Sequence, residues 1–253
     1  MDLNVAASLL SGYLIALGRT AGFVLATPPF NTRAFPARAR SGLALALALP
    51  LSARTIPTAP PLGTGSMIGS MLLQILAGVI LGFFVQLAVA AIQMVGDLID
   101  VAGGFSISIG NDPLLLVQSS VMGRLHQLIA VTLLFVGDGH LVVLQGLTRS
   151  LELMPQPDLD LRLVAQAATD GLAQMFVSAV QITAPVLAAL LIADIALGLL
   201  TRAAPAMNAF ALAFPLKIVL SLLLIGLILT QLPGALGRLV NEAGLTILKL
   251  SGG

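Results

Sequence analysis

The residues from 55 to 96 include no charged side chain and are mostly apolar. A helix of about 20 apolar residues is long enough to cross the hydrocarbon core of a bilayer. The same excess of apolar over charged residues holds for the whole chain, which has 58% hydrophobic and 9% charged residues and a mean hydropathy of +1.04. Soluble domains usually contain about 25% charged residues. We therefore predict an integral membrane protein with helical spans, because the strands of a membrane barrel show only short alternating segments.

Charge and cysteine content exclude several classes of site. The formal net charge is +1, so no basic surface for nucleic acid is expected. Cysteine is absent, which excludes disulfides, thiolate metal ligands and cysteine nucleophiles. The start, Met1-Asp2-Leu3, lacks the basic residues of a cleaved signal peptide. We therefore expect the first apolar segment to remain in the mature protein.

The apolar segments predict an all-α fold, a polytopic membrane protein of long kinked helices and helical hairpins. The six expected helices cover about 5–26, 41–53, 67–100, 122–149, 163–200 and 207–232. The second is too short to span, because a helix rises only about 1.5 Å per residue. Glycines at 137–139 predict a break in the fourth helix, and Pro185 predicts a kink in the fifth.

Charged and amide side chains interrupt the apolar stretch that runs from Asp194 to Lys217. A charge at the bilayer centre costs at least about 2.5–3.5 kcal/mol on insertion scales. Pro205 and Pro215 each remove a backbone donor and are expected to break a helix where lipid offers no replacement. We expect this segment to contact protein rather than lipid. In the first helix, Arg19 is expected to pair with an acid of another helix or to extend toward water.

Candidate catalytic and metal-binding residues are few. Asp97 and Asp100 lie one helical turn apart, a spacing that suits paired carboxylates, but no third ligand is spaced to match. His126 and His140 show no zinc-binding spacing, and His140 is expected to cap the break beside Asp138. The chain also lacks a phosphate-binding loop, a nucleophile elbow and the pattern of an intramembrane aspartyl protease. We therefore expect no enzyme, cofactor or metal site.

The segment 103–121 mixes glycines and polar residues with apolar side chains. An apolar loop at membrane depth is tolerated only against protein or along a cavity. We therefore predict a plug or a re-entrant element rather than an ordinary surface loop.

Several passages, taken in order, resemble the FliR family, which comprises the flagellar export-gate protein and its injectisome counterpart, the T component of type III secretion systems. The matching passages are 33–49, 82–100, 104–106, Asp112 and Pro113, Gly139 and His140, Ala184 and Pro185, 196–205, Asn208, and 214–217. The passage 196–205, A-L-G-L-L-T-R-A-A-P, is specific, and the others are weak alone. Their order and spacing cover nearly the whole chain.

The resemblance implies a single-copy, non-enzymatic subunit of a type III export gate, similar to a P subunit fused to a Q subunit. It implies one membrane domain over 1–253, with a P-like part over 1–150 and a Q-like helical hairpin within 151–253. The implied partners are the P and Q components in a hetero-oligomer, the export switch protein (B component), the proton-driven export protein (A component), unfolded proteins in transit and the lipid bilayer. The implied location is the bacterial inner membrane at the flagellar basal body.

The resemblance also assigns site residues. The channel loop of the family falls on about 104–122. Its candidate sealing residues are Phe105, Ile107, Ile109, Leu114, Leu115, Leu116 and Val117. The candidate subunit contacts are Arg19, Asp97, Asp100, Asp194, Arg202, Asn208 and Lys217.

Two alternatives remain open at this point. One is the injectisome T component, which the motifs do not separate firmly from the flagellar protein, although the closeness of 96–113 and 196–217 favours the flagellum. The other is a secondary transporter, for which broken helices and charges at membrane depth are equally natural. The transporter should show two pseudo-symmetric halves, and we find no internal repeat.

Overall fold

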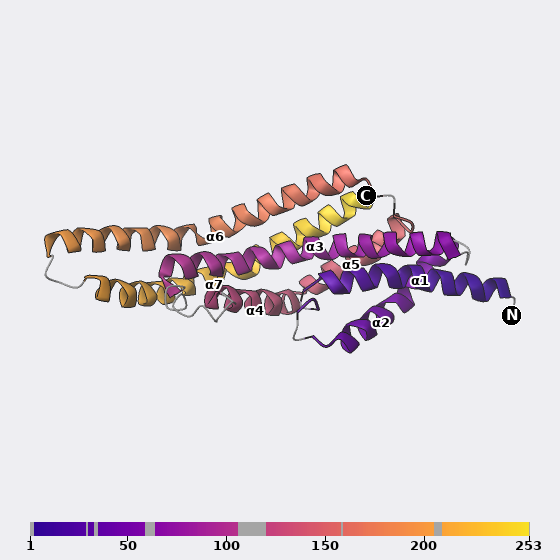
Figure 1. Cartoon of the computed structure of the whole chain (residues 1–253), viewed down its shortest axis with the longest axis horizontal. Helices are drawn as coiled ribbons and strands as arrows, with labels where there is room; N and C mark the ends of the chain where they lie inside the picture. Colours follow the sequence, from indigo (N-terminus) through magenta and orange to yellow (C-terminus); the bar gives the residue numbers. More distant parts are fainter. Residues whose placement is uncertain are drawn as a thin grey trace. The chain divides into compact units, whose positions relative to one another are not determined.

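The computed structural model describes residues 3–28, 30–32, 35–58, 64–105, 120–157, 159–204 and 209–252. Within these ranges every regular element is a helix (Figure 1), which confirms the all-α prediction. The elements are α1 (Leu3–Ala26), α2 (Ala37–Thr55), the 3₁₀ turn η1 (Ile56–Thr58), α3 (Thr64–Gly103), α4 (Val121–Val136), α5 (Gly139–Leu153), α6 (Leu161–Ala203) and α7 (Ala209–Leu250).

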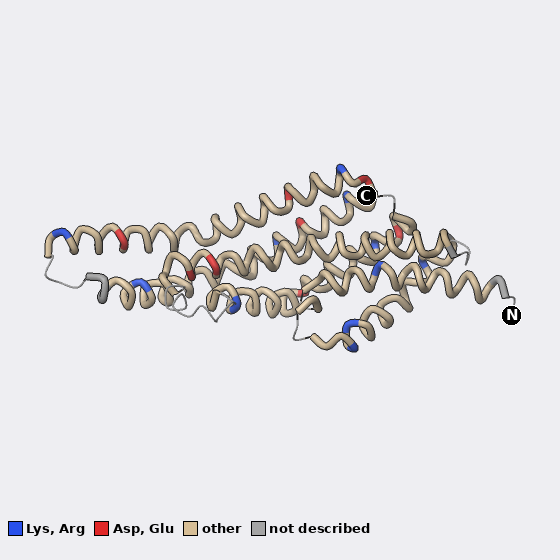
Figure 2. Tube along the Cα trace, viewed as in Figure 1, with Lys and Arg blue, Asp and Glu red and all other residues tan. Residues whose placement is uncertain are grey.

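Four of the described helices are long and apolar enough to cross a membrane. These candidate spans are Val5–Ala26, Gly65–Gly103, Leu161–Ala203 and Ala213–Leu250. The pair α4 and α5 passes the same test together but bends by 72°, which gives five spans if the pair is one. Charged residues are sparse along these helices (Figure 2). The prediction of a polytopic helical membrane protein is therefore confirmed.

The predicted break in the fourth helix lies between α4 and α5. Asp138 takes a left-handed conformation with φ 56° between Gly137 and Gly139, which short polar side chains tolerate. The expectation that His140 caps the break is wrong. His140 lies inside the first turn of α5, and its ring packs against Phe135 with 5.3 Å between centroids.

The last helix is longer than predicted. We expected it to end at residue 232, before the Pro233-Gly234 pair, but α7 continues to Leu250. Pro215 was also expected to break a helix and lies inside α7, while Pro205 lies outside the described residues. A proline removes one backbone hydrogen bond. Packing of apolar side chains on both sides of Pro233 offsets that loss, because Leu232 and Leu236 are buried.

Backbone contacts divide the chain into two compact units. The first contains 1–88, 135–172 and 238–253, and the second contains 89–134 and 173–237. The helices α3, α4, α6 and α7 each contribute residues to both units. The predicted division of the chain at residue 150 into P-like and Q-like parts stays a prediction.

In the first unit, α1 and α3 pack backbone against backbone. A Cβ atom on Gly22 would overlap the carbonyl of Ile75, and one on Gly78 would overlap the carbonyl of Arg19. Small residues allow such close approach between membrane helices. The contact places the middle of α1, including Arg19, directly against α3.

The candidate spans differ in how much of their surface the chain itself covers. In the most apolar windows of α1 and α3, 56% and 61% of the residues are buried, against 28% in α6 and 17% in α7. Large apolar side chains such as Ile192, Leu199 and Leu223 are more than half exposed on α6 and α7. These faces therefore need lipid or another protein to cover them.

Candidate functional site

The described ends of the predicted plug loop form the candidate site. Residues 106–119, which include the predicted sealing residues from Ile107 to Val117, lie outside the described residues. The first end is Gly103, Gly104 and Phe105, at the end of α3. The second end is Ser120, directly before α4.

The first end of the loop packs against α7. Gly104 has φ +81°, a conformation that favours glycine. A Cβ atom there would meet the Phe214 ring at 3.3 Å. A Cβ atom on Gly103 would meet the Ser221 hydroxyl at 2.5 Å. The pair of glycines therefore lets the chain leave α3 in close contact with α7.

The second end is held by hydrogen bonds to the first turn of α4. The Ser120 hydroxyl accepts a bond of 2.8 Å from the Gly123 amide, as a helix-capping serine does. The Met122 amide donates to Asp100 Oδ1 of α3 at 3.3 Å. Asp100 is only 2% exposed, so this carboxylate is buried against the N-terminus of α4. A negative charge is favourable at that end of a helix.

Close backbone packing reinforces the second end. A Cβ atom on Gly96 would overlap the carbonyl of Met122, and one on Gly123 would overlap the carboxylate of Asp97. The two ends of the loop thus both lie at the last two turns of α3. We refer to this placement of the two described ends, 103–105 and 120–123, as the closed base of the loop.

A buried histidine lies one turn beyond this contact. His126 has no exposed surface, and its Nδ1 lies 2.8 Å from the Met122 carbonyl. Its Nε2 has no hydrogen-bond partner among the described residues. Sequence reasoning considered His126 only as a zinc ligand. Within the described ranges, no three His, Asp or Glu residues are arranged to hold a metal ion.

The charged residues near the end of α6 include one ion pair. Lys217 Nζ of α7 lies 2.5 Å from Asp194 Oδ1 of α6, and the side chains are 19% and 48% exposed. Asp194 therefore pairs with another helix of the same chain. Arg202 is exposed at the end of α6, and Asn208 lies outside the described residues. The role of these residues as subunit contacts stays a prediction.

Arg19 lies in the core of the first unit, far from the loop in sequence, and is 1% exposed. Its Nε donates to Gln74 Oε1 at 2.7 Å, Nη1 to the Ser150 carbonyl at 2.6 Å and Nη2 to the Met154 carbonyl at 2.7 Å. We expected an acid of another helix or a side chain that extends toward water, whereas these partners are neutral and the guanidinium is buried. The Ser150 carbonyl, which also accepts from the Met154 amide, and the Met154 carbonyl lie at the C-terminal end of α5, where the helix dipole favours a positive charge. Its predicted role as a subunit contact stays a prediction.

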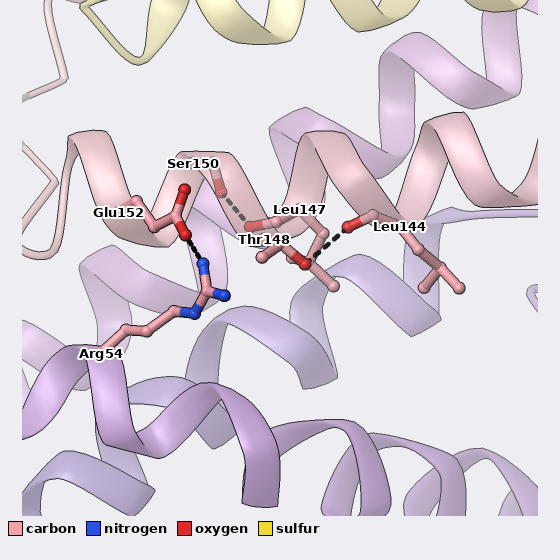
Figure 3. Close-up of polar contacts among 6 residues, drawn as sticks. All are labelled: Arg54, Leu144, Leu147, Thr148, Ser150 and Glu152. Atoms are coloured by element: carbon pink, nitrogen blue, oxygen red, sulfur yellow. Dashed lines mark hydrogen bonds and ion pairs between the residues drawn. The ribbon is translucent and has the colours of Figure 1, made fainter.

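A second polar contact joins α2 to α5. Arg54 forms an ion pair with Glu152 near the end of α5 (Figure 3). Both side chains are more than a third exposed, so the pair adds little stability. Neither residue was singled out from the sequence, because their separation along the chain leaves no local signal.

Comparison with known proteins identifies the family. The bacterial export proteins, family 1, match residues 10–243. The chain belongs to this family. The "Flagellar biosynthetic protein FliR" of Bacillus subtilis is 30% identical over 230 residues, which cover 88% of each chain. That of Pectobacterium carotovorum is 29% identical over 227 residues, 88% of this chain and 86% of the relative.

A relative of lower identity carries a different name. The "Surface presentation of antigens protein SpaR" of Salmonella typhimurium is 25% identical over 209 residues, 83% of this chain and 79% of the relative. The resemblance to the FliR family is therefore confirmed. As a member of this family, the chain is a component of type III protein export, an inner-membrane protein with several spans and not an enzyme.

Proposed function

We propose that this chain is a subunit of the flagellar export gate, and that its residues 104–122 plug the channel through which unfolded flagellar proteins cross the inner membrane. The observation that carries the proposal is the closed base of the loop. Asp100 holds the Met122 amide, and Gly96 packs against the same turn of α4. Both loop ends are thereby attached to α3.

A loop that is attached at both ends can move in its middle without moving its helices. The middle of this loop carries the sealing candidates Ile107, Ile109, Leu114, Leu115, Leu116 and Val117. Apolar constrictions close pores by excluding water. A passing polypeptide would displace these side chains, and they would close the channel again behind it. Energy would come from the proton-driven export protein, since this chain shows no nucleotide-binding motif.

The exposed faces of α6 and α7 support a hetero-oligomer with the P and Q components. These helices bury little of their apolar surface within the chain. Asp194, which is 48% exposed, lies among them. A charge is costly in contact with lipid and acceptable against protein. We propose that Asp194, Arg202, Asn208 and Lys217 lie at contacts with these sister subunits.

Replacing residues 107–117 with a glycine-serine linker of equal length tests the plug. We expect the altered gate to assemble and to leak ions, measured as conductance of membranes that contain the complex. The matched control replaces 156–160, between α5 and α6, in the same way and should not leak. An assembled gate with unchanged conductance would show that the loop is not the plug.

The choice between flagellum and injectisome rests on the relatives. The FliR proteins named above match more of this chain at higher identity than SpaR does. The "Yop proteins translocation protein T" of Yersinia pestis is 28% identical over 60% of the chain. We therefore favour the flagellar gate. Deleting the gene in its own host should abolish flagellar filaments, and intact filaments with lost secretion of other proteins would favour the injectisome.

A further inference from the structure

Arg19 carries a buried positive charge for which the described residues provide no acid. The guanidinium accepts no hydrogen bonds and has five N–H groups that need acceptors. Its acceptors are Gln74 Oε1 and the carbonyls of Ser150 and Met154, with a longer contact of 3.4 Å to the Ser150 hydroxyl. These contacts use at most four of the five N–H groups. One N–H on Nη2 therefore lacks an acceptor in this part of the chain.

The acid at the end of α5 does not balance this charge. Glu152 forms its ion pair with Arg54 of α2 (Figure 3). The C-terminal carbonyls of α5 contribute only the equivalent of about half a negative charge. A net positive charge thus remains at Arg19 within a candidate membrane span, where an unpaired charge is costly.

A small cavity in the first unit adjoins the guanidinium. Its polar lining comes from Arg19, Ser150 and Ser251, and the remaining walls are mostly aliphatic, with Ala77 and Leu81 among them. Arg19 is the only cation in this lining, and the lining includes no acid. Aliphatic walls lower the local dielectric constant, which strengthens the attraction between Arg19 and any negative charge.

We propose that this cavity binds one small monovalent anion of the chloride class, held by the free N–H and the charge of Arg19. One buried cation matches one negative charge, so a doubly charged phosphate would leave a net charge of the opposite sign. The small size of the cavity favours a monatomic ion. A water molecule could accept the hydrogen bond but would leave the charge of Arg19 unbalanced. The anion would thereby stabilise the packing of α1, α3 and α5.

The test compares chloride with gluconate at equal sodium concentration, with the purified full chain in detergent. Thermal unfolding is followed by helical circular dichroism. We expect chloride to raise the unfolding midpoint of the wild type by a few degrees and to reach a plateau. Arg54→Gln, which removes an exposed arginine of the same unit, should keep the rise. Arg19→Gln should lose it.

A second variant keeps the test decisive if Arg19→Gln does not fold. Ser251→Leu places a larger apolar side chain in the cavity lining, and the Ser251 hydroxyl donates to the Ile247 carbonyl rather than bonding to Arg19. It should fold in gluconate and show no rise in chloride. Broadening of the chloride-35 resonance should be present with the wild type and Arg54→Gln and absent with Ser251→Leu. Equal chloride effects in all variants, or none in the wild type, would overturn the proposal and leave water as the occupant.

Discussion

Gly96 of α3 faces Gly123 of α4 so closely that a Cβ atom on Gly96 would lie 2.8 Å from the Gly123 Cα. The distance is shorter than real Cβ contacts, and the atoms it meets belong to the backbone. The two helices can therefore cross here only because both positions lack a side chain. This crossing fixes the second end of the proposed plug on α3.

Gly96→Ala should therefore separate α3 from α4. We expect a loss of about 1–3 kcal/mol of unfolding free energy, the usual effect of overpacking. Gly226→Ala is the control, because a Cβ atom there meets nothing within 4 Å, and alanine should be neutral or stabilising in that helix. Denaturant unfolding in detergent measures both. Equal stability of the two variants would contradict the close crossing.

Asp100→Leu should release the first turn of α4. The Met122 amide would lose its acceptor inside the protein, which costs about 1–3 kcal/mol. Asp100→Asn keeps a side-chain oxygen at the same place and should lose much less. Hydrogen exchange at the amides of Met122 and Gly123 measures the release. We expect faster exchange in Asp100→Leu than in Asp100→Asn, and the same rate in both would argue that the contact with Asp100 is unimportant.

Gln74 connects Arg19 to the segment after α5, because its Oε1 accepts from Arg19 and its Nε2 donates to the Pro155 carbonyl at 2.6 Å. Gln74→Leu should destabilise the chain by at least about 1–3 kcal/mol, since a buried charged donor loses its acceptor. Gln74→Glu supplies an acceptor with a negative charge. It should unfold at a higher temperature than Gln74→Leu and show less dependence on chloride than the wild type. Chloride dependence equal to that of the wild type would count against a charge imbalance at Arg19.

The pair Asp194 and Lys217 should be sensitive to the sign of each charge. Asp194→Lys places two positive charges together and should weaken co-purification with the P and Q components. The double variant Asp194→Lys with Lys217→Asp restores opposite charges and should recover most of the yield. In the isolated chain the effect should be small, on the order of 0.2–1 kcal/mol, because exposed pairs are screened. If the double variant co-purifies no better than the single one, each charge interacts with the sister subunits rather than with the other charge of the pair.

Long helices and their main break were predictable because their signals are local. Apolar runs identified α1, α3 and α6 to within a few residues, and the glycines around Asp138 identified the break between α4 and α5. The end of α7 was missed because Pro233 and Gly234 resemble a helix stop. Packing on both sides of the proline decides whether the helix continues. Such packing leaves no signal in the local sequence.

For the site too, features with a local signal were predicted from the sequence and contacts between distant residues were not. Sequence patterns pointed to an apolar loop after α3 and to unusual charges at Arg19, Asp97, Asp100 and Asp194. They did not indicate that Asp100 would cap α4 or that Asp194 would pair with Lys217. Gln74 carried no signal at all, since one glutamine in an apolar helix is common.

Composition and the periodic apolar runs by themselves determined that this chain is a helical membrane protein, and its ordered motifs determined its family. Only the tertiary structure decided which side chain meets which. Arg19, Gln74 and Ser150 are far apart along the chain and meet because α1, α3 and the end of α5 pack together. The physical reason is that burial free energy and helix propensity depend on residue type and local spacing, whereas a hydrogen bond or an ion pair requires two particular atoms to lie within about 3 Å after folding.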